Sequence, residues 1–179
     1  MLDTILEHNG LNNMGIEKLI VGELSENCYI ITKNNKTVII DPGAEPQKII
    51  DACKDKNVVG VLITHHHFDH VGALHDLEKY FNIKESNIIS GFDYEVISTP
   101  GHTKDSVTYY FKQEKVMFTG DFIFNGSIGR YDLPSGSYND ILESISKIYV
   151  YPDDIIIYPG HGNVTTLKKE KTNLSYYLN

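Results

Sequence analysis

Four histidines and one aspartate lie within six consecutive residues of this chain, in the segment His65-His66-His67-Phe68-Asp69-His70. Imidazole nitrogens and carboxylate oxygens are the ligands that zinc and similar divalent metals prefer. An apolar run at residues 58–63 comes directly before the segment and is typical of a buried strand. After the segment, apolar residues are spaced along one helical face, at Val71, Leu74, Leu77 and Phe81. The pattern predicts a strand that ends in a ligand-bearing loop, followed by a helix over residues 69–81.

The length and charge of the chain limit what else it can be. Its 179 residues suit a single domain over residues 1–179. The net charge of −8 argues against a nucleic-acid-binding surface, which needs clustered lysine and arginine. The chain has no apolar run of the ~18 residues that a membrane span requires, and its first residues lack the pattern of a signal peptide. Cys28 and Cys53 fall in core-like patterns, which favours buried, reduced thiols and a cytoplasmic location.

Strand-like and helix-like runs alternate along the chain, which is an α/β pattern. Residues 1–15 carry little signal. We expect strands at residues 18–21, 28–32, 37–40, 58–63, 87–90, 94–98, 107–111, 115–118 and 154–158. Asn34 and Asn35 lie between the second and third strands and predict a hairpin turn. We expect further helices from Pro46, over residues 138–149 and over residues 166–178.

Three more residues of metal-ligand type each follow a predicted strand, with a glycine beside each one. They are His102 in Pro-Gly-His, Asp121 in Thr-Gly-Asp and His161 in Pro-Gly-His-Gly. Glycine permits the sharp turns and the close backbone approach that a crowded metal site needs. Taken singly, each is a weak signal, because a lone histidine in such a turn is more often a surface residue. Together with His65, His67, Asp69 and His70 of the first segment they make seven ligands, enough for two metals that share one carboxylate.

With these motifs the chain resembles the metallo-β-lactamase-fold superfamily, in its hydroxyacylglutathione-hydrolase (glyoxalase II)-like branch of small single-domain proteins. The resemblance rests on Thr64-His-His-His-Phe-Asp-His70, Pro100-Gly-His-Thr-Lys-Asp-Ser106, Thr119-Gly-Asp121, Gly129-Arg-Tyr-Asp-Leu-Pro134 and Tyr158-Pro-Gly-His-Gly162. Glu26-Asn-Cys-Tyr29 and Ile40-Asp-Pro-Gly43 are also similar to this branch. The resemblance implies an α/β fold, a four-layer αβ/βα sandwich with its metals at one edge, between the two sheets. Compared with the branch, the chain is shortened between residues 76 and 100.

The resemblance also implies a role for each ligand. His65, His67 and His102 would hold the first metal, whereas Asp69, His70 and His161 would hold the second. Asp121 would bridge both. Zinc is the metal that we expect in both positions. Iron and manganese are alternatives, because ligand sets of histidine and aspartate accept several metals.

Other polar residues near these motifs have weaker assignments. Asp41 would support a ligand through a hydrogen bond or stabilise the turn before Pro-Gly. Arg130 would contact a substrate carboxylate or form a salt bridge near Asp132. His66 does not fall on a ligand position, so we expect it to face solvent or to support the ligands. His75 and His8 are expected to be surface residues.

The activity that this resemblance implies is hydrolysis of a thioester, such as S-lactoylglutathione or a related acyl-thiol. Two divalent cations acidify a shared water and supply a metal-bridging hydroxide at neutral pH, and Asp69 can orient it or take its proton. Because the sequence ends soon after His161, we expect it to be without the C-terminal helical domain that binds glutathione in full glyoxalase II enzymes. The predicted site is therefore more exposed to solvent. A second copy of the chain that covers it, in a homo-oligomer, is one possibility.

Other functions remain as alternatives. A persulfide dioxygenase with a single iron would keep the same His-x-His-x-Asp-His pattern. A non-catalytic metal-binding domain of the same fold would keep all the ligands. A zinc β-lactamase is less favoured, because the commonest of these have cysteine at the position of Asp121.

Overall fold

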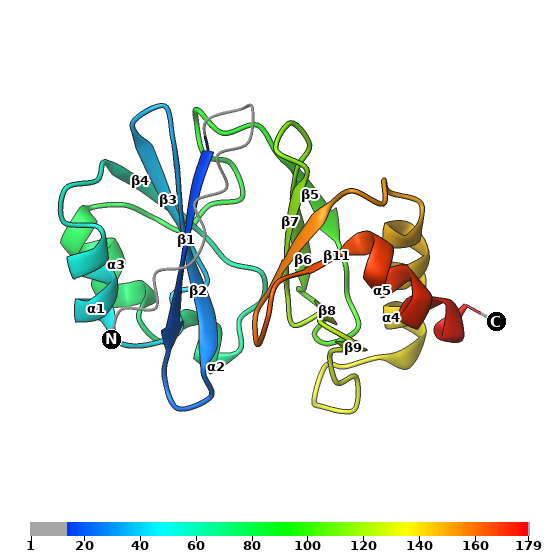
Figure 1. Ribbon diagram of the computed structural model, residues 1–179. Helices are drawn as coiled ribbons and strands as arrows, with labels where there is room; N and C mark the ends of the chain where they lie inside the picture. Colours follow the sequence, from blue (N-terminus) through cyan, green and yellow to red (C-terminus); the bar gives the residue numbers. More distant parts are fainter. Residues whose placement is uncertain (1–13, 179) are drawn as a thin grey trace. The chain divides into compact units, whose positions relative to one another are not determined.

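The computed structural model describes residues 14–178, which form two compact units that divide between Asp93 and Tyr94 (Figure 1). Each unit contains one mixed β-sheet and its own helices. No helix among the described residues is long and apolar enough to cross a membrane. The predicted surface position of His8, and all of the lead-in before Met14, lie outside the described residues.

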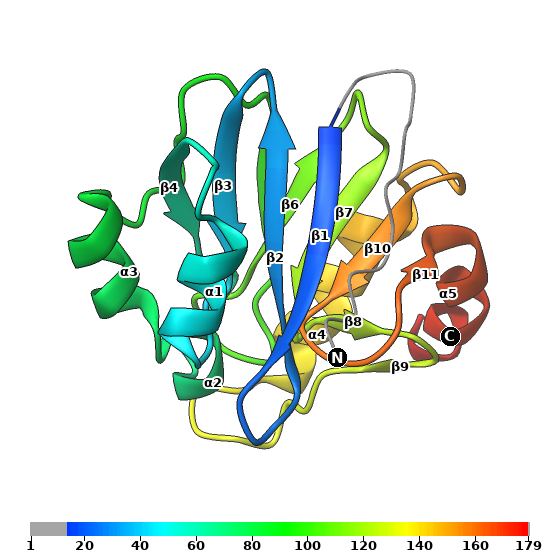
Figure 2. The same ribbon diagram turned by 60° about the vertical axis from the view of Figure 1, so that its left-hand side comes forward.

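The sheet of the first unit has the order β1-β2-β3-β4, with the strands side by side in Figure 2. Its strands are β1 (Met14–Val21), β2 (Glu26–Lys33), β3 (Lys36–Ile40) and β4 (Val58–Leu62). The first three are antiparallel, and β4 runs parallel to β3 after a crossover through α1 (Pro46–Ala52). Asn34 and Asn35 both have positive φ, 50° and 58°, which is the geometry of a type I′ hairpin turn. The predicted hairpin is therefore confirmed.

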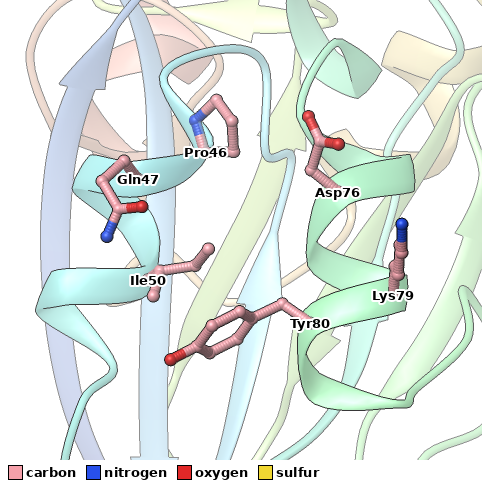
Figure 3. Close-up of a pocket in the computed structure, with 6 residues that line it drawn as sticks. All are labelled: Pro46, Gln47, Ile50, Asp76, Lys79 and Tyr80. Atoms are coloured by element: carbon pink, nitrogen blue, oxygen red, sulfur yellow. The ribbon is translucent and has the colours of Figure 1, made fainter.

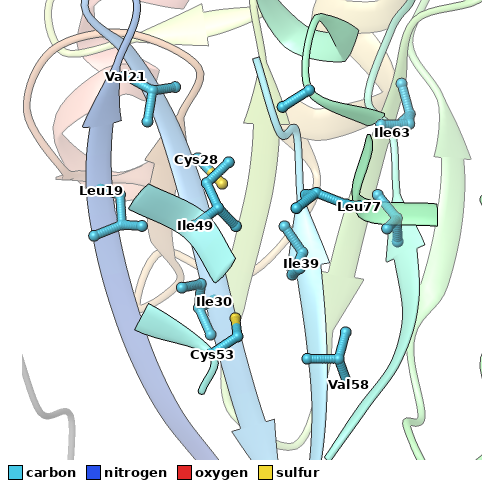
Figure 4. Close-up of a cluster of buried hydrophobic side chains, with 12 residues drawn as sticks. Leu19, Val21, Cys28, Ile30, Ile39, Ile49, Cys53, Val58, Ile63 and Leu77 are labelled. Atoms are coloured by element: carbon cyan, nitrogen blue, oxygen red, sulfur yellow. The ribbon is translucent and has the colours of Figure 1, made fainter. Parts of the chain in front are cut away.

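One face of this sheet is covered by α1 and α3 (Leu74–Phe81), which lie on the same side of it in Figure 1. Figure 4 shows the core between them, where Ile49 of α1 and Leu77 of α3 pack on strand residues such as Ile30 and Ile39. Cys28 and Cys53 belong to this core and are free, as predicted. A hollow of about 420 Å³ lies between α1 and α3, and no predicted ligand lines it. Figure 3 shows the residues that line it, among them Ile50 of α1 and Tyr80 of α3.

The predicted helix after the ligand segment is wrong in one respect, because it is broken into α2 (Phe68–Val71) and α3. The break lies at Gly72 and Ala73. The Ala73 N–H donates to the Pro42 carbonyl at 2.9 Å and so leaves the ladder of i to i−4 hydrogen bonds. A Cβ at Gly72 would overlap the Gly43 carbonyl oxygen. The break is therefore the place where the loop after β3 packs against the ligand segment.

The strand predicted at residues 87–90 is not present. The chain makes one parallel bridge, from Glu85 to Val61, and then turns. The Ser86 hydroxyl bonds to both the N–H and the C=O of Ile88, and Phe92 N–H donates to the Ile89 carbonyl. These turn bonds occupy the backbone groups that a strand would need. The apolar residues of this segment pack on the sheet instead of joining it, since the Ile89 side chain lies over Gly60 of β4.

The sheet of the second unit has the order β11-β10-β7-β6-β5. Its strands are β5 (Glu95–Ser98), β6 (Val107–Phe111), β7 (Val116–Gly120), β10 (Ile156–Pro159) and β11 (Thr165–Thr166). The predicted β6–β7 hairpin is confirmed, and β10 runs parallel to β7. A short hairpin of β8 (Ile123–Phe124) and β9 (Ser127–Ile128), which the sequence did not predict, follows β7.

The second unit has its helices on one face of its sheet, with a shared core of isoleucines and leucines. The helix α4 (Tyr138–Tyr149) matches the prediction, and its N-cap Ser137 accepts the Asp140 N–H. The last helix is shorter than predicted: α5 (Leu167–Leu174) begins after the N-cap Thr166 and is followed by the 3₁₀ turn η1 (Ser175–Tyr177).

Candidate metal centre

Four of the seven predicted ligands lie in the first unit, in the loop and short helix that follow β4. His65 Nε2 and His67 Nδ1 are 3.2 Å apart. Two ligands at 2.0–2.1 Å on a tetrahedral zinc are separated by roughly 3.3 Å, so this spacing fits one shared metal. His70 Nε2 lies 3.8 Å from Asp69 Oδ2, which gives a second nitrogen–oxygen pair in the same loop.

Asp41, in the loop after β3, organises this ligand segment. Its carboxylate accepts the Thr64 N–H at 2.7 Å and the Thr64 hydroxyl at 2.6 Å. It also accepts the His70 Nδ1–H at 3.0 Å. Because Nδ1 of His70 donates to a carboxylate, Nε2 is the basic nitrogen that can bind a metal. The supporting hydrogen bond predicted for Asp41 is therefore present in the structure.

The Asp41 carboxylate also orients His65, indirectly, through the Thr64 hydroxyl that lies between them. Since the Thr64 hydroxyl gives its proton to Asp41, the Thr64 oxygen accepts from His65 Nδ1 at 3.2 Å. This bond again makes Nε2 the basic nitrogen. Asp41 thus fixes the tautomers of two predicted ligands, one directly and one through Thr64.

Glu26, at the start of β2, is a buried carboxylate in this group; the sequence pointed to it only as part of a motif similar to the family and predicted no role for it. Its Oε1 lies 3.8 Å from His70 Nδ1, and its side chain is 1% exposed. With Asp41 it places two carboxylates beside one imidazole. The signal for it was a glutamate directly before the strand predicted at residues 28–32, whose Cys28, Tyr29, Ile30 and Ile31 are core-type residues.

Three predicted ligands lie in the second unit, in loops after β5, β7 and β10. The two oxygens of the Asp121 carboxylate face different histidines. Asp121 Oδ2 is 3.6 Å from His102 Nε2, and Asp121 Oδ1 is 3.6 Å from His161 Nε2. His102 Nδ1 donates to the Arg130 carbonyl at 2.7 Å, so its Nε2 is the basic nitrogen. A carboxylate with one histidine at each oxygen is the arrangement expected of a ligand shared by two metals.

Glycines allow this group to form. A Cβ at Gly129 would overlap the Asp121 carbonyl oxygen, so the backbone next to Arg130 can approach Asp121 only as glycine. Gly101 has φ of 139° and packs against the backbone of Ile141 in α4, where a side chain would clash. Gly101 therefore serves close backbone approach, as the sequence indicated, and Gly129 does the same in a motif for which the sequence predicted no such role.

The remaining predicted residues lie apart from these contacts. Arg130 forms a two-point ion pair with Asp132, at 2.9 and 3.1 Å, on the surface. This confirms the salt bridge and lowers the pKa of Asp132, mainly through the hydrogen bond from Arg130. His66 is exposed and lies 3.1 Å from Glu85, and His75 is exposed, as expected for both. A substrate contact by Arg130 stays a prediction.

Two half-sites of histidine and aspartate, each next to the ends of parallel strands in an α/β fold, define a metal-binding protein. The chain belongs to the Metallo-beta-lactamase superfamily, whose family model matches residues 21–88 and 81–161. The predicted fold class is therefore confirmed. The two matched segments meet at residues 81–88, within the stretch that the sequence predicts to be shortened.

Curated relatives and solved structures support the family assignment. The chain is 33% identical to "Hydroxyacylglutathione hydrolase GloC" of Haemophilus influenzae, over 88% of this chain and 95% of that protein. It is 31% identical to "Probable metallo-hydrolase YqgX" of Bacillus subtilis, over 86% and 93%. Among solved structures it is similar to BLEG-1 B3 metallo-beta-lactamase, with 28% identity, a TM-score of 0.86 and coverage of 92% and 100%. It is also similar to TTHA1623 in a di-iron-bound form, with 28% identity, a TM-score of 0.79 and coverage of 86% and 96%. The chain is thus a metal-dependent hydrolase by family.

Proposed function

We propose that the chain hydrolyses a thioester, such as S-lactoylglutathione or a related acyl-thiol. The reaction would use two divalent metal ions, for which zinc is the first choice. The observation that carries this proposal is the Asp121 carboxylate, whose two oxygens face His102 and His161 separately. A carboxylate with that geometry can bind two metals, one through each oxygen, whereas a single metal would use only one of its two histidine neighbours. The similarity to a hydroxyacylglutathione hydrolase supports the thioester as substrate.

The ligands divide between the two ions as the resemblance implies. The first would be held by His65, His67 and His102. The second would be held by Asp69, His70 and His161, and Asp121 would bridge them. The distances within each unit fit such a set, and the tautomers of His65, His70 and His102 present Nε2 as the basic nitrogen. When bound, two such ions acidify a water and polarise a carbonyl.

The protein contributes position and proton transfer. Asp41 and the Arg130 carbonyl hold the ligand imidazoles in place through His70 Nδ1 and His102 Nδ1. Asp69 has a partly exposed carboxylate and is the residue proposed to orient the attacking water or take its proton. The thiolate leaving group needs little protonation, so no separate general acid is required.

The test is metal content and S-lactoylglutathione hydrolysis in the wild type and in Asp69→Ala. We expect the wild type to hold about two metals per chain and to hydrolyse the thioester. We expect Asp69→Ala to fold normally, to hold one metal weakly and to lose about 10²–10⁴-fold in kcat/KM, as loss of a general base does. Asp55→Ala, a change at an exposed residue of the same unit, is the matched control. Full activity of Asp69→Ala would sink the mechanism.

The same preparations separate the alternatives. A single iron without thioester hydrolysis would favour a persulfide dioxygenase, to be tested by oxygen uptake with a persulfide. Because BLEG-1 is a B3 metallo-beta-lactamase of similar structure, β-lactam hydrolysis is a second candidate function. Hydrolysis of nitrocefin faster than of any thioester would favour it. Metal binding without any turnover would leave a non-catalytic metal-binding domain.

A further inference from the structure

One buried carboxylate of the second unit has no part in the proposed chemistry. Glu170 lies in α5 and is only 1% exposed, although glutamate is almost never fully buried unless it is paired. Its Oε1 accepts the Thr165 hydroxyl at 2.6 Å, and its Oε2 accepts the Gly126 N–H and the Asn173 side-chain amide, both at 2.9 Å. Donors from β11, from the β8–β9 turn and from α5 itself therefore converge on this carboxylate.

The bond from Gly126 belongs to a set that ties the β8–β9 turn to the later part of the chain. Asn125 and Gly126 form this turn, between the paired residues of the two strands. Asn125 Nδ2 donates to the Val164 carbonyl at 3.4 Å, and Asn125 Oδ1 accepts the Lys169 ammonium at 2.6 Å. These two bonds are exposed, whereas the bond to Glu170 is partly buried. Because water competes less with a buried bond, we expect Glu170 to hold the turn most firmly.

The hairpin that ends in this turn lies next to each predicted ligand of the second unit. It begins two residues after Asp121 and ends two residues before Arg130, whose carbonyl accepts from His102 Nδ1 at 2.7 Å. The ring of Phe124, in β8, meets the ring of His161 edge-on, with 6.2 Å between the ring centroids. A shift of the hairpin would therefore disturb all three ligands together.

We propose that Glu170 is a positioning residue of the metal centre. By holding the β8–β9 turn, it fixes the spacing of His102, Asp121 and His161. Its hydrogen-bond partners do not include a predicted ligand, so it acts through the hairpin. The inference rests on the proposed function, because the ligands concerned are those of the proposed metals. Ligands that are held in one geometry bind a metal at a lower entropic cost.

Two substitutions of Glu170 separate its hydrogen bonds from its charge. Glu170→Met keeps the length of the side chain but has no oxygen to accept the Gly126 N–H. Glu170→Gln loses the charge, but its amide oxygen can still accept from Gly126 while its amide nitrogen donates to the Thr165 hydroxyl oxygen. We expect Glu170→Met to weaken zinc binding about 10-fold, the lower end of the effect of residues that support metal ligands, and Glu170→Gln to restore it. Zinc titration of the metal-free chain against a competing chelator measures the affinity.

Thr165→Val distinguishes positioning from a general loss of stability. It removes the donor at the other carboxylate oxygen and leaves the Gly126 bond in place. Thr165→Val and Glu170→Met should both lower the urea midpoint, because each leaves a buried polar group without its partner. Only Glu170→Met should weaken zinc binding. Glu143→Gln, at an exposed position of α4, should change neither quantity.

The Gly126 amide reports on the turn in the metal-free protein. In Glu170→Met its NMR signal should shift and its hydrogen exchange should become about 10-fold faster, whereas Thr165→Val should leave both unchanged. Asn125→Ala loosens the same turn at its two exposed bonds and leaves the core intact. It should also weaken zinc binding, by a smaller factor, and it decides the question if Glu170→Met fails to fold.

Three outcomes would overturn the positioning role. One is unchanged zinc affinity in Glu170→Met or, if that variant does not fold, in Asn125→Ala. Another is an equal loss of affinity in Glu170→Met and Thr165→Val, and the third is an equal loss in Glu170→Met and Glu170→Gln.

None of these measurements uses a substrate, so they stand apart from the proposed function. The expected zinc affinities without turnover of any thioester by the wild type would sustain the positioning role and overturn the function. Thioester turnover with unchanged zinc affinity in Glu170→Met would do the reverse.

Discussion

Single hydrogen bonds fix the tautomer of three predicted ligands before any metal binds. His65, His70 and His102 each have Nδ1 committed to an oxygen acceptor, through Thr64, Asp41 and the Arg130 carbonyl respectively. A histidine held in this way presents Nε2 in one direction. This lowers the entropic cost of binding a metal, and partners of this kind typically change metal affinity 10- to 100-fold.

Asp41 is the residue where this effect should be largest, since its carboxylate accepts three hydrogen bonds. We expect Asp41→Asn to weaken metal binding about 10- to 100-fold and to lower the free energy of unfolding by ~2 kcal/mol, because the amide cannot accept all three. Metal titration and urea unfolding measure the two effects. Asp55→Asn, exposed in the same unit, should change neither, and a metal affinity unchanged in Asp41→Asn would contradict the role.

The two cysteines give a prediction about chemical reactivity. Burial raises the pKa of the Cys53 thiol to about 11, and burial together with the nearby Glu26 raises the pKa of Cys28. At pH 8 both groups should be thiols, so the native protein should react with a thiol reagent at least roughly 100-fold more slowly than a free cysteine. The same chain in guanidinium chloride should label at both cysteines. Rapid labelling of the native protein would show that one of them is accessible.

At the scale of elements, the ligands gather because neighbouring strands end at the same edge of a sheet. In the second unit β7 and β10 are parallel, with Gly120 beside Pro159, so the loops that carry Asp121 and His161 start next to each other. In the first unit β3 and β4 are parallel, with Ile40 beside Leu62, so Asp41 and Thr64 meet in the same way. Parallel pairing therefore places a ligand and its partner together across a long stretch of sequence.

Glu78 of α3 holds the segment after the helix and gives a pH-dependent prediction. Its carboxylate accepts the Glu85 N–H at 3.0 Å and the Lys84 ammonium at 3.1 Å, which lowers the pKa of Glu78. A carboxyl group with a lowered pKa stabilises the fold above its ordinary pKa, and this stabilisation is lost as the pH falls through the lowered value.

We therefore expect Glu78→Gln to be less stable than the wild type by about 0.5–1 kcal/mol at pH 7, with the difference vanishing once the pH falls below the lowered pKa of Glu78. Urea unfolding at a series of pH values measures it. Glu143→Gln, at an exposed position of α4, is the matched control. A constant difference at every pH would show that the carboxylate charge is not the cause.

At the scale of the whole molecule, the chain consists of two compact units, and the predicted ligands are divided between them, four and three. Metals bound by these ligands should stabilise the folded chain, because a ligand that binds only the native state shifts the unfolding equilibrium. The prediction of a single domain over residues 1–179 stays a prediction, to which the unfolding behaviour with and without metal is relevant.

Removal of the metals should lower the midpoint of thermal unfolding by roughly 10 °C. A ligand at 1,000 times its Kd contributes ~4 kcal/mol, and in a chain of this size each kcal/mol shifts Tm by about 2–4 °C. Calorimetry before and after dialysis against a chelator measures the change, and restored zinc should reverse it. Asp121→Asn should show a smaller shift, and an unchanged Tm on chelation would contradict a stabilising bound metal.

The sequence by itself determined the family, the α/β class and most helices and strands, and it predicted the residues that the structure gathers into histidine and aspartate clusters. It could do so because ligand chemistry and hydrophobic periodicity are local: His65 to His70 are neighbours in the chain, and the helix over residues 138–149 repeats its apolar face within one segment. The hairpin at Asn34-Asn35 was equally local, since its two residues tolerate positive φ.

Only the tertiary structure decided the features that depend on segments distant in sequence. The break between α2 and α3 comes from Pro42 and Gly43, and the loss of the strand at residues 87–90 comes from turn bonds combined with packing over Gly60. The burial of Glu26 beside His70, and the hydrogen bond from Gly126 to Glu170, likewise join residues that are more than 40 positions apart. Such contacts leave no periodic signal, because each is made once, between two segments that meet only when the sheet has formed.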